Sequence, residues 1–533
     1  MRQIVRFLAL PVAAALLLAS CSAEAPPAAH RPNAAAPASK VNVVELSIAQ
    51  AQQGMAAGSF GSADLVDAYL ARIAAVDDAG PTLGAVIALS ADARQQAERL
   101  DVERAAGQLR GPMHGIPVLV KDNIDVAGLP TTAGSLAMAN HRPSDDAFLV
   151  GRLRDAGAVI LGKTNLSEWA NFRSTRSTSG WSSAGGQTRN PYVLDRTPCG
   201  SSSGTGAAIA ASLAAVGVGT ETDGSILCPS AVSGLVGLKP TVGRVSRMGI
   251  VPISISQDTA GPMARSVADA AVLMAALDGA DSRDPAHRDA AAPDYAAAVA
   301  GATLVGRRIG VVRQAMGRDA RVDALFETAL DAMRAAGAEV VDPVEVPTWS
   351  QWGEAELIVL LHEFKSGLND YLREGKAPHG DLAALIAWNQ ENGAEAMPWF
   401  GQELFEQAQA TDGLHATTYR EAAANAKRLA GADGLVKALA AQRLDALVAP
   451  TTGPAWPIDP VLGDRFGFAG YGIAAVAGTP SLTLPMGDVH GLPVGLTLLG
   501  AADSEAALLG MAQALEAALP SRQPPQYRAS LVP

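Results

Sequence analysis

The stretch from Pro198 to Pro240 decides the fold, because it holds two clusters of small residues on either side of an alanine-rich segment. The first cluster reads Pro198-Cys-Gly-Ser-Ser-Ser-Gly-Thr-Gly206, and the second reads Val216-Gly-Val-Gly-Thr-Glu-Thr-Asp-Gly-Ser-Ile226. Glycine lets a backbone approach another group closely, and a serine beside free backbone N–H groups suits nucleophilic acyl chemistry. Two ordinary turns around a packed helix are the alternative interpretation of this stretch alone.

Apolar runs of strand length alternate with helical patterns along the rest of the chain. The strand-like runs lie at 115–121, 158–161, 234–240, 307–312, 338–341, 445–450, 478–485 and 492–500. The helical patterns lie within 45–83, where a second helix opens at Ser62, and at 91–107, 144–156, 266–277 and 321–336. This rhythm predicts an α/β fold in which helices cover a sheet. Residues 345–430 are helical in pattern and hold four of the seven tryptophans, which predicts a helical subregion with its own core or a wall near the substrate entrance.

Composition limits the possible partners and cofactors. The chain of 533 residues is 48% hydrophobic and 18% charged, which is typical of a globular protein with a large core. Its net charge of −12 argues against nucleic acid, because phosphate binding needs clustered Lys and Arg. The chain has no His-Glu-x-x-His, no Cys-x-x-Cys and no Rossmann glycine fingerprint after a strand, so we expect neither a metal nor a cofactor. The oligomeric state is left open.

The N-terminus predicts export. A basic start is followed by an apolar run at 7–18, which indicates a signal segment over residues 1–20. Leu18-Ala-Ser-Cys21 resembles the bacterial lipobox, so we expect a lipidated Cys21 and periplasmic membrane attachment, with an ordinary cleaved signal as the alternative. The Ala/Pro-rich residues 21–42 predict a disordered tether before a single domain at 43–533. In an oxidising compartment Cys199 and Cys228 have the opportunity to pair, although sequence does not give their separation.

Two familiar motifs match by spacing but fail on context. Gly157-Ala-Val-Ile-Leu-Gly-Lys-Thr164 has P-loop spacing, yet its middle residues read as a strand rather than the flexible loop that cradles phosphate. Gly200-Ser-Ser-Ser-Gly204 has the spacing of a nucleophile elbow, which needs a hydrophobic strand before it. The preceding residues 190–198 are turn-rich. A Ser–His–Asp enzyme using Asp488 and His490 is therefore an alternative, not the first choice.

Lys121 is the leading candidate for a base. It follows Val118-Leu-Val120 at the end of a strand-like run, where we expect it to be buried. Burial disfavours the charged amine and lowers its pKa, so a neutral lysine is able to take a proton from a serine. Each of the two small-residue clusters offers such a serine. His114, by contrast, reads as a structural residue.

The motifs together resemble the amidase signature family, and within it the bacterial peptide amidases. The pieces that carry the resemblance are 114–123, 162–168, 198–240, 257–266 and 478–480, and coverage runs from about residue 45 to the C-terminus. The resemblance implies the amidase-signature fold, a large mixed central β-sheet with helices on both faces. It also implies an amide hydrolase whose substrate is a small-molecule or peptide amide.

The same resemblance implies a Ser–cisSer–Lys triad. Ser225 is then the nucleophile, Ser201 the bridging serine on a cis peptide bond, and Lys121 the base. The backbone N–H groups of Thr222, Asp223, Gly224 and Ser225 are the implied oxyanion hole.

This chain departs from the commoner signature at two positions. Asp223 replaces a glycine, and Leu227 replaces the arginine two residues after the nucleophile. Asp223 places a carboxylate near the acyl site, which disfavours anionic substrates. Two further alternatives stay open, the glutaminase subunit of a tRNA-dependent amidotransferase and a lipid-anchored binding protein that no longer uses its triad. The export signal argues against the first, since that complex works in the cytosol.

Overall fold

The computed structural model describes residues 41–531, which belong to one compact unit. The predicted signal segment 1–20 and Cys21 lie outside the described residues. Of the predicted tether, only the last two residues are described, and the Val41 side chain is already buried in the hydrophobic core.

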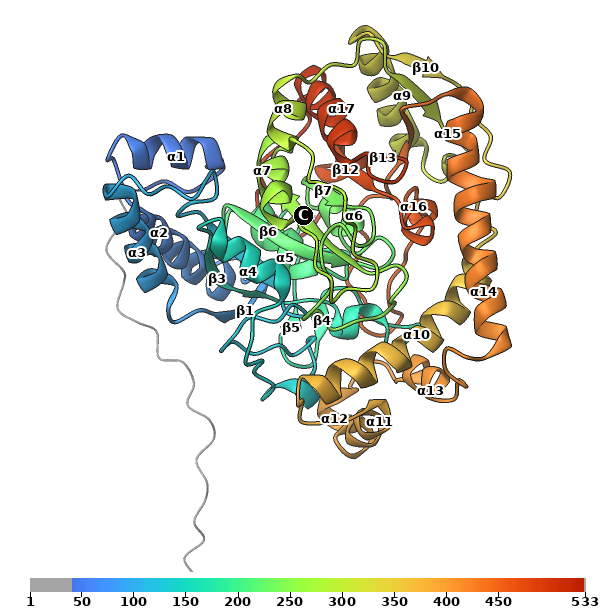
Figure 1. Cartoon of the computed structure of the whole chain (residues 1–533), viewed down its shortest axis with the longest axis horizontal. Coiled ribbons are helices and arrows are strands. Elements are labelled where there is room, and N and C mark those ends of the chain that lie inside the picture. Colours follow the sequence, from blue (N-terminus) through green and yellow to red (C-terminus); the bar gives the residue numbers. More distant parts are fainter. Residues whose placement is uncertain (1–40, 532–533) are drawn as a thin grey trace, which may run out of the picture. The chain divides into compact units, whose positions relative to one another are not determined.

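A mixed sheet of eleven strands runs through this unit (Figure 1), in the order β1-β3-β2-β6-β8-β7-β12-β13-β11-β9-β10. Both ends of the sheet contain parallel pairs, β3-β2-β6 at one end and β11-β9-β10 at the other, while the strands between them pair antiparallel. The strands are β1 (Val86–Leu89), β2 (Pro117–Lys121), β3 (Val159–Thr164), β6 (Val216–Glu221), β7 (Val236–Lys239), β8 (Thr259–Ala264), β9 (Arg308–Val311), β10 (Glu339–Val341), β11 (Ala446–Pro450), β12 (Ser481–Val489) and β13 (Leu492–Leu499), and a separate hairpin pairs β4 (Trp181–Ser182) with β5 (Gly186–Gln187).

Helices pack against the sheet and complete the α/β fold that the motifs predicted. Helices α5 and α6 contact each other and the central strands, whereas α7, α8, α9 and α17 form another connected group against β8 and β12. The helices are α1 (Ile48–Ala56), α2 (Ser62–Ile73), α3 (Ala93–Ala105), α4 (Phe148–Asp155), α5 (Ser203–Ala210), α6 (Leu227–Val232), α7 (Val267–Leu277), α8 (Tyr295–Ala300), α9 (Ala320–Ala335), α10 (Gly353–Glu374), α11 (Leu382–Glu391), α12 (Gly393–Ala396), α13 (Glu403–Gln409), α14 (Thr417–Lys427), α15 (Val436–Gln442), α16 (Gly472–Ala477) and α17 (Glu505–Ala518).

The aromatic-rich subregion is helical, as predicted, and rests on cores of its own. Helices α10, α11 and α13 bury Phe364, Leu385 and Phe405 in a cluster separate from the main core. Trp169 and Phe172, from the segment after β3, join this cluster. The subregion is therefore anchored on the segment that follows β3.

Candidate active site

A tight turn after β6 presents Ser225. Gly224 has a φ of +78°, and a Cβ at this position would collide with the ring of Tyr471, so only glycine fits. The buried Glu221 carboxylate closes the turn by accepting hydrogen bonds from the N–H groups of Ile226 at 2.7 Å and Leu227 at 3.0 Å. The turn is thus held by a side chain within the second small-residue cluster.

The first small-residue cluster packs directly against this turn. The peptide bond from Gly200 to Ser201 is cis, and α5 begins two residues later. The N–H of Ser202 donates to the carbonyl of Ser225 at 3.1 Å. A disulfide joins Cys199 to Cys228, with their Cα atoms 5.9 Å apart. The two clusters are therefore linked both by hydrogen bonding and covalently, and the structure settles the pairing of cysteines that the sequence left open.

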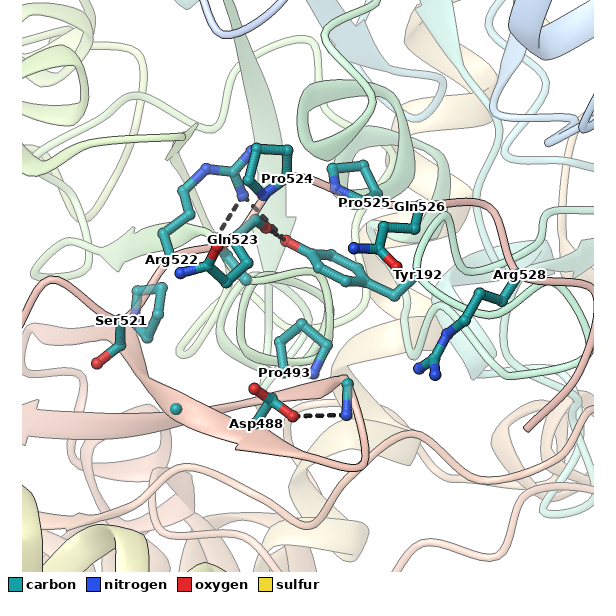
Figure 2. A pocket seen from close by; sticks show the side chains of 14 residues that line it. Tyr192, Asp488, Pro493, Ser521, Arg522, Gln523, Pro524, Pro525, Gln526 and Arg528 are labelled. Atoms are coloured by element: carbon teal, nitrogen blue, oxygen red, sulfur yellow. Dashed lines mark hydrogen bonds between the residues drawn. The ribbon is translucent and has the colours of Figure 1, made fainter. Parts of the chain in front are cut away.

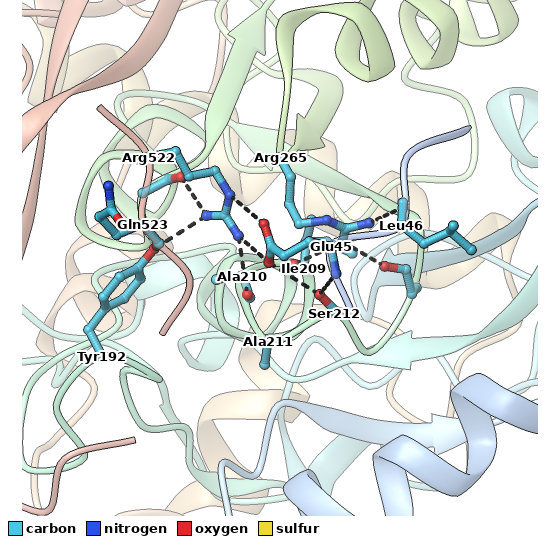
Figure 3. Close-up of polar contacts among 12 residues, drawn as sticks. Glu45, Leu46, Tyr192, Ile209, Ala210, Ala211, Ser212, Arg265, Arg522 and Gln523 are labelled. Carbon is cyan, nitrogen blue, oxygen red and sulfur yellow. Dashed lines mark hydrogen bonds and ion pairs between the residues drawn. The ribbon is translucent and has the colours of Figure 1, made fainter. Parts of the chain in front are cut away.

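Arginines hold the far end of α5 (Figure 3). Helix C-termini leave carbonyls without intrahelical partners, and cations there are favourable. Arg265 donates to the carbonyl of Ile209 at 3.1 Å, and Arg522 to that of Ala210 at 3.4 Å. Arg522 also forms an ion pair with Glu45 at 2.8 Å, which brings the two ends of the described chain to this helix. The helix that follows Ser201 is thereby fixed at its other end.

Lys121 ends β2, between β3 and β6, and its amine is buried as the sequence predicted. The Nζ atom lies 2.7 Å from Ser201 Oγ and 2.8 Å from Thr220 Oγ1, with the Thr220 carbonyl at 3.3 Å. Burial lowers the pKa of Lys121 to about 7, although Asp258 and Glu221 oppose the shift. A neutral amine has two N–H groups and one lone pair. The Thr220 Oγ1 and carbonyl oxygens accept hydrogen bonds from the two N–H groups, so the lone pair is left to accept from the Ser201 hydroxyl.

A cavity of about 470 Å³ opens at Ser225. Ser225, Thr222, Asp223 and Gly200 line it, whereas Lys121 and Ser201 are fully buried behind it. Within residues 41–531, no group accepts a hydrogen bond from the backbone N–H of Asp223 or Ser225. The Gly224 N–H instead faces the Glu221 carboxylate. The sequence-predicted residues are thus brought to one place, with Ser225 as the member that contacts the cavity.

The helical subregion supplies part of the cavity wall. Leu360 of α10 and Leu404 of α13 line it. Of the tryptophans, Trp456 lines the cavity, but none of the four in residues 345–430 does. The subregion thus lies at the entrance through its leucines rather than its tryptophans.

Several buried polar residues near the site were missed by sequence reasoning. Asp258 accepts a hydrogen bond from Thr222 Oγ1 at 2.5 Å, and burial raises the pKa of this carboxyl to about 6. Gln257 Nε2 donates to Glu356 Oε1 at 2.9 Å and lies 3.4 Å from the carbonyl of Thr222. Residues 257–258 belong to a motif that carried the resemblance, so a signal for them existed. Glu356 lies on α10 and had no signal in the sequence.

The structure also argues against the two motifs that match by spacing alone, the P-loop spacing at 157–164 and the nucleophile-elbow spacing at 200–204. Residues 159–164 form the buried strand β3, and Lys163 pairs with Asp122 at 2.9 Å instead of facing a phosphate loop. No strand directly precedes Ser202, whose Oγ donates to the Thr220 carbonyl.

Asp488 lines a different cavity of about 390 Å³ beside the C-terminal segment (Figure 2), where its carboxylate accepts from the N–H of Gly491. His490 has a φ of 58° on the turn between β12 and β13. No histidine lines the cavity at Ser225 among the described residues, and His114 is buried with Nε2 2.9 Å from the Leu100 carbonyl.

Within residues 41–531, no cluster of three or more His, Cys, Asp or Glu side chains is arranged to hold a metal ion. No helix in the same range has the length and apolar character of a membrane span.

Comparisons with known proteins identify the family. The family model for amidases matches residues 64–509. The chain belongs to the amidase family. It is an amide hydrolase with the amidase-signature fold. A crystal structure of a peptide amidase bound to the competitive inhibitor chymostatin is 55% identical, with a TM-score of 0.89 over 90% of this chain and 99% of that one.

Two other similar proteins carry different names within the family. The native peptide amidase from Stenotrophomonas maltophilia is 54% identical, with a TM-score of 0.87 over 91% of this amidase and 99% of that chain. A glutamyl-tRNA(Gln) amidotransferase subunit from Roseiflexus castenholzii is 38% identical, and the match covers 89% of this chain and 95% of the relative. The proteins similar to this chain therefore include both peptide amidases and an amidotransferase subunit.

Proposed function

We propose that this amidase hydrolyses C-terminal amides of peptides, or related small amides, with Lys121, Ser201 and Ser225 as its triad. The observation that carries the triad is the buried contact of 2.7 Å between Lys121 Nζ and Ser201 Oγ, beside a turn whose serine faces the cavity. The peptide substrate is supported by the similarity to peptide amidases.

The cycle follows from the order of these groups. Neutral Lys121 takes the proton of Ser201, and Ser201 takes that of Ser225 as its Oγ attacks the amide carbonyl. Free N–H groups of Asp223 and Ser225 stabilise the oxyanion, with Thr222 and Gly224 completing the turn. The relay returns the proton to the departing amine, and water then hydrolyses the acyl-enzyme by the same route.

The experiment is ammonia release from matched peptide amides, aryl amides, fatty amides and free glutamine. We expect the peptide amides to give the highest kcat/KM, and Ser225→Ala to abolish release while retaining the wild-type far-UV spectrum. Ser233→Ala is the matched control, because its Oγ is buried and has no partner among the described residues. A preference for glutamine would favour the amidotransferase role instead, and a stable wild type that hydrolyses none of the amides and resists fluorophosphonate labelling would favour a binding protein.

We also propose that the protein is exported and lipid-anchored through Cys21. The Cys199–Cys228 disulfide supports export, because the cytosol keeps such thiols reduced. Fractionation of the producing cell tests this. We expect the protein in the membrane fraction, and Cys21→Ala in the soluble exported fraction; a cytosolic wild type with free thiols would contradict the proposal.

A further inference from the structure

Asp223 has a carboxylate that faces the cavity without a protein partner. It lines the cavity together with Ser225, two residues further on, and its side chain is exposed there. Among residues 41–531, no donor or cation bonds to this carboxylate. Its space is provided by Gly472, since a Cβ there would lie 3.2 Å from Asp223 Oδ2. An acid in this position is available to whatever occupies the acyl site.

A second carboxylate, that of Glu356, lies near the carboxylate of Asp223. Glu356 lies in the first turn of α10 and is only 9% exposed. Gln257 ties it to the nucleophile turn, because its Nε2 donates to Glu356 at 2.9 Å and approaches the carbonyl of Thr222 at 3.4 Å. Thr222 is the neighbour of Asp223 in the chain. The helical subregion thus places an acidic side chain, Glu356 of α10, near the acyl site.

The surroundings favour one negative charge on this pair near neutral pH. Burial raises the pKa of Glu356 to about 7. Asp223 is reached from the cavity but has protein packed around it. This desolvation, together with the nearby Glu356 and Glu221, raises the pKa of Asp223 well above its usual range, against the pull of Lys239. Tyr471 packs beside Asp223 and stays protonated, because burial raises its pKa as well. Two acids that repel one another do not both ionise, so they hold one proton and one charge between them.

The reaction itself changes the charge at this place. A neutral amide enters, and after hydrolysis a carboxylate remains beside Ser225 and Asp223. Arg176 is the only cationic side chain lining the cavity among the described residues, and it is exposed, so solvent and salt screen it. The charge next to the reacting carbon is therefore negative.

We propose that Asp223, backed by Glu356, excludes carboxylates from the acyl site, so that the enzyme expels its acid product and refuses chains that end in a free carboxylate. This inference rests on the proposed amide hydrolysis. It makes Asp223 a specificity residue for uncharged acyl ends and Glu356 a positioning residue that sets the ionisation of Asp223.

The test compares the inhibition constant Ki of an acid with the kinetics of its own amide. The pair consists of the best amide found in the panel and its hydrolysis product, so the inference is tested whichever amide class the enzyme prefers. In Asp223→Asn we expect Ki for the acid to fall about tenfold or more, because like charges in contact cost that much or more. The KM of the amide falls less than this Ki, since a neutral ligand gains nothing from the loss of the charge. Any disturbance of the oxyanion hole, to which Asp223 contributes its N–H, appears in kcat instead. Glu98→Gln, an exposed acid on α3, controls for net charge and leaves both constants unchanged.

Glu356→Gln distinguishes an electrostatic role from a structural one, because the amide oxygen still accepts from Gln257. In the wild type we expect acid inhibition to strengthen as the pH falls and the pair takes up its second proton. In Glu356→Gln this transition moves to higher pH, since Asp223 alone must then carry the charge that the wild-type pair shares. An unchanged Ki in Asp223→Asn, a loss of amide kcat/KM larger than the gain in acid binding, or an unshifted transition in Glu356→Gln would each overturn the inference. A wild type inactive on every amide would instead overturn the proposed function.

Discussion

Lys121 Nζ lies 2.7 Å from Ser201 Oγ, and neither side chain is exposed to solvent. A lysine in this setting loses the hydration that favours its ammonium form, and its pKa falls to about 7. The contact therefore places a base with a large neutral fraction near pH 7 against a hydroxyl that does not itself reach the cavity. Ser225, the next residue in the proposed proton relay, is the one that lines the cavity.

The pH profile of kcat/KM tests this base. The amine accepts a proton only when it is neutral, so activity rises with pH through about 7 and levels off above it. Initial rates between about pH 5.5 and 8.5 measure this rising limb of the pH profile. Lys121→Ala is expected to reduce kcat by about 10²–10⁴-fold and to remove the limb. A flat wild-type profile over this range, or a near-normal kcat in the variant, would refute the role of Lys121.

The bridging role of Ser201 predicts a kcat effect without a matching effect on binding. Ser201 is buried and does not line the cavity, so Ser201→Ala leaves substrate contacts in place. We expect kcat to fall by about 10²–10⁴-fold while KM changes little. Ser233→Ala, also buried, keeps the wild-type kcat. Equal effects of the two substitutions would mean that Ser201 only packs.

The disulfide predicts a stability effect that depends on redox state. Cys199 and Cys228 close a loop with a sequence separation of 29, which in the chain-entropy model corresponds to about 3.6 kcal/mol of unfolding free energy. Urea unfolding of the double variant Cys199→Ser/Cys228→Ser is expected to show this loss. Dithiothreitol is expected to lower the unfolding free energy of the wild type but not that of the double variant. Two titratable thiols in the folded, untreated protein would show that the bond does not form.

Glu221 predicts a graded response at the nucleophile turn. Glu221→Gln retains an uncharged acceptor for the N–H groups of Ile226 and Leu227, whereas Glu221→Ala leaves both buried donors unpaired, at about 1–3 kcal/mol each. We expect Glu221→Ala to lower both the unfolding free energy and the rate of fluorophosphonate labelling more than Glu221→Gln does. Unfolding in urea and labelling kinetics measure the two effects. Labelling at the wild-type rate in Glu221→Ala would show that the turn holds its shape without the carboxylate.

Local sequence patterns predicted the helices and strands well where the burial and hydrogen bonds of an element depend on residues nearby in the sequence. The run before Lys121 is a buried strand, and Ser266 caps α7 by accepting from the N–H of Asp269, as its sequence indicates. The prediction failed at Ser144-Asp-Asp146, because α4 begins only at Phe148. There Asp146 accepts from the N–H of Ala127 at 2.9 Å and pairs with Arg154, so other contacts use a side chain that the pattern placed in the first turn of the helix.

The site was predicted unevenly for the same reason. Burial of Lys121 follows from its own neighbours in the chain, but the choice of Ser201 over Ser202 came only from the family resemblance. Ser202 is equally buried and differs by donating to the Thr220 carbonyl, a contact set by the sheet. Glu356 was beyond reach, because α10 is far from Asp223 in sequence, and Gln257 links Glu356 to Thr222, the neighbour of Asp223, only in the folded chain.

The Arg522–Glu45 pair gives the last prediction, because it joins the ends of the described chain to α5. Arg522 donates to Glu45 at 2.8 Å, to the Gly234 carbonyl at 2.7 Å and to the Ala210 carbonyl at 3.4 Å, and its side chain is only 14% exposed. Arg522→Ala leaves these acceptors without their donor, so we expect a loss of about 2–4 kcal/mol in urea unfolding. Arg94→Ala removes an exposed pair with Asp67 and is expected to cost less than about 1 kcal/mol. Equal losses in the two variants would show that the Arg522 contacts do not bind the chain ends to the helix that follows Ser201.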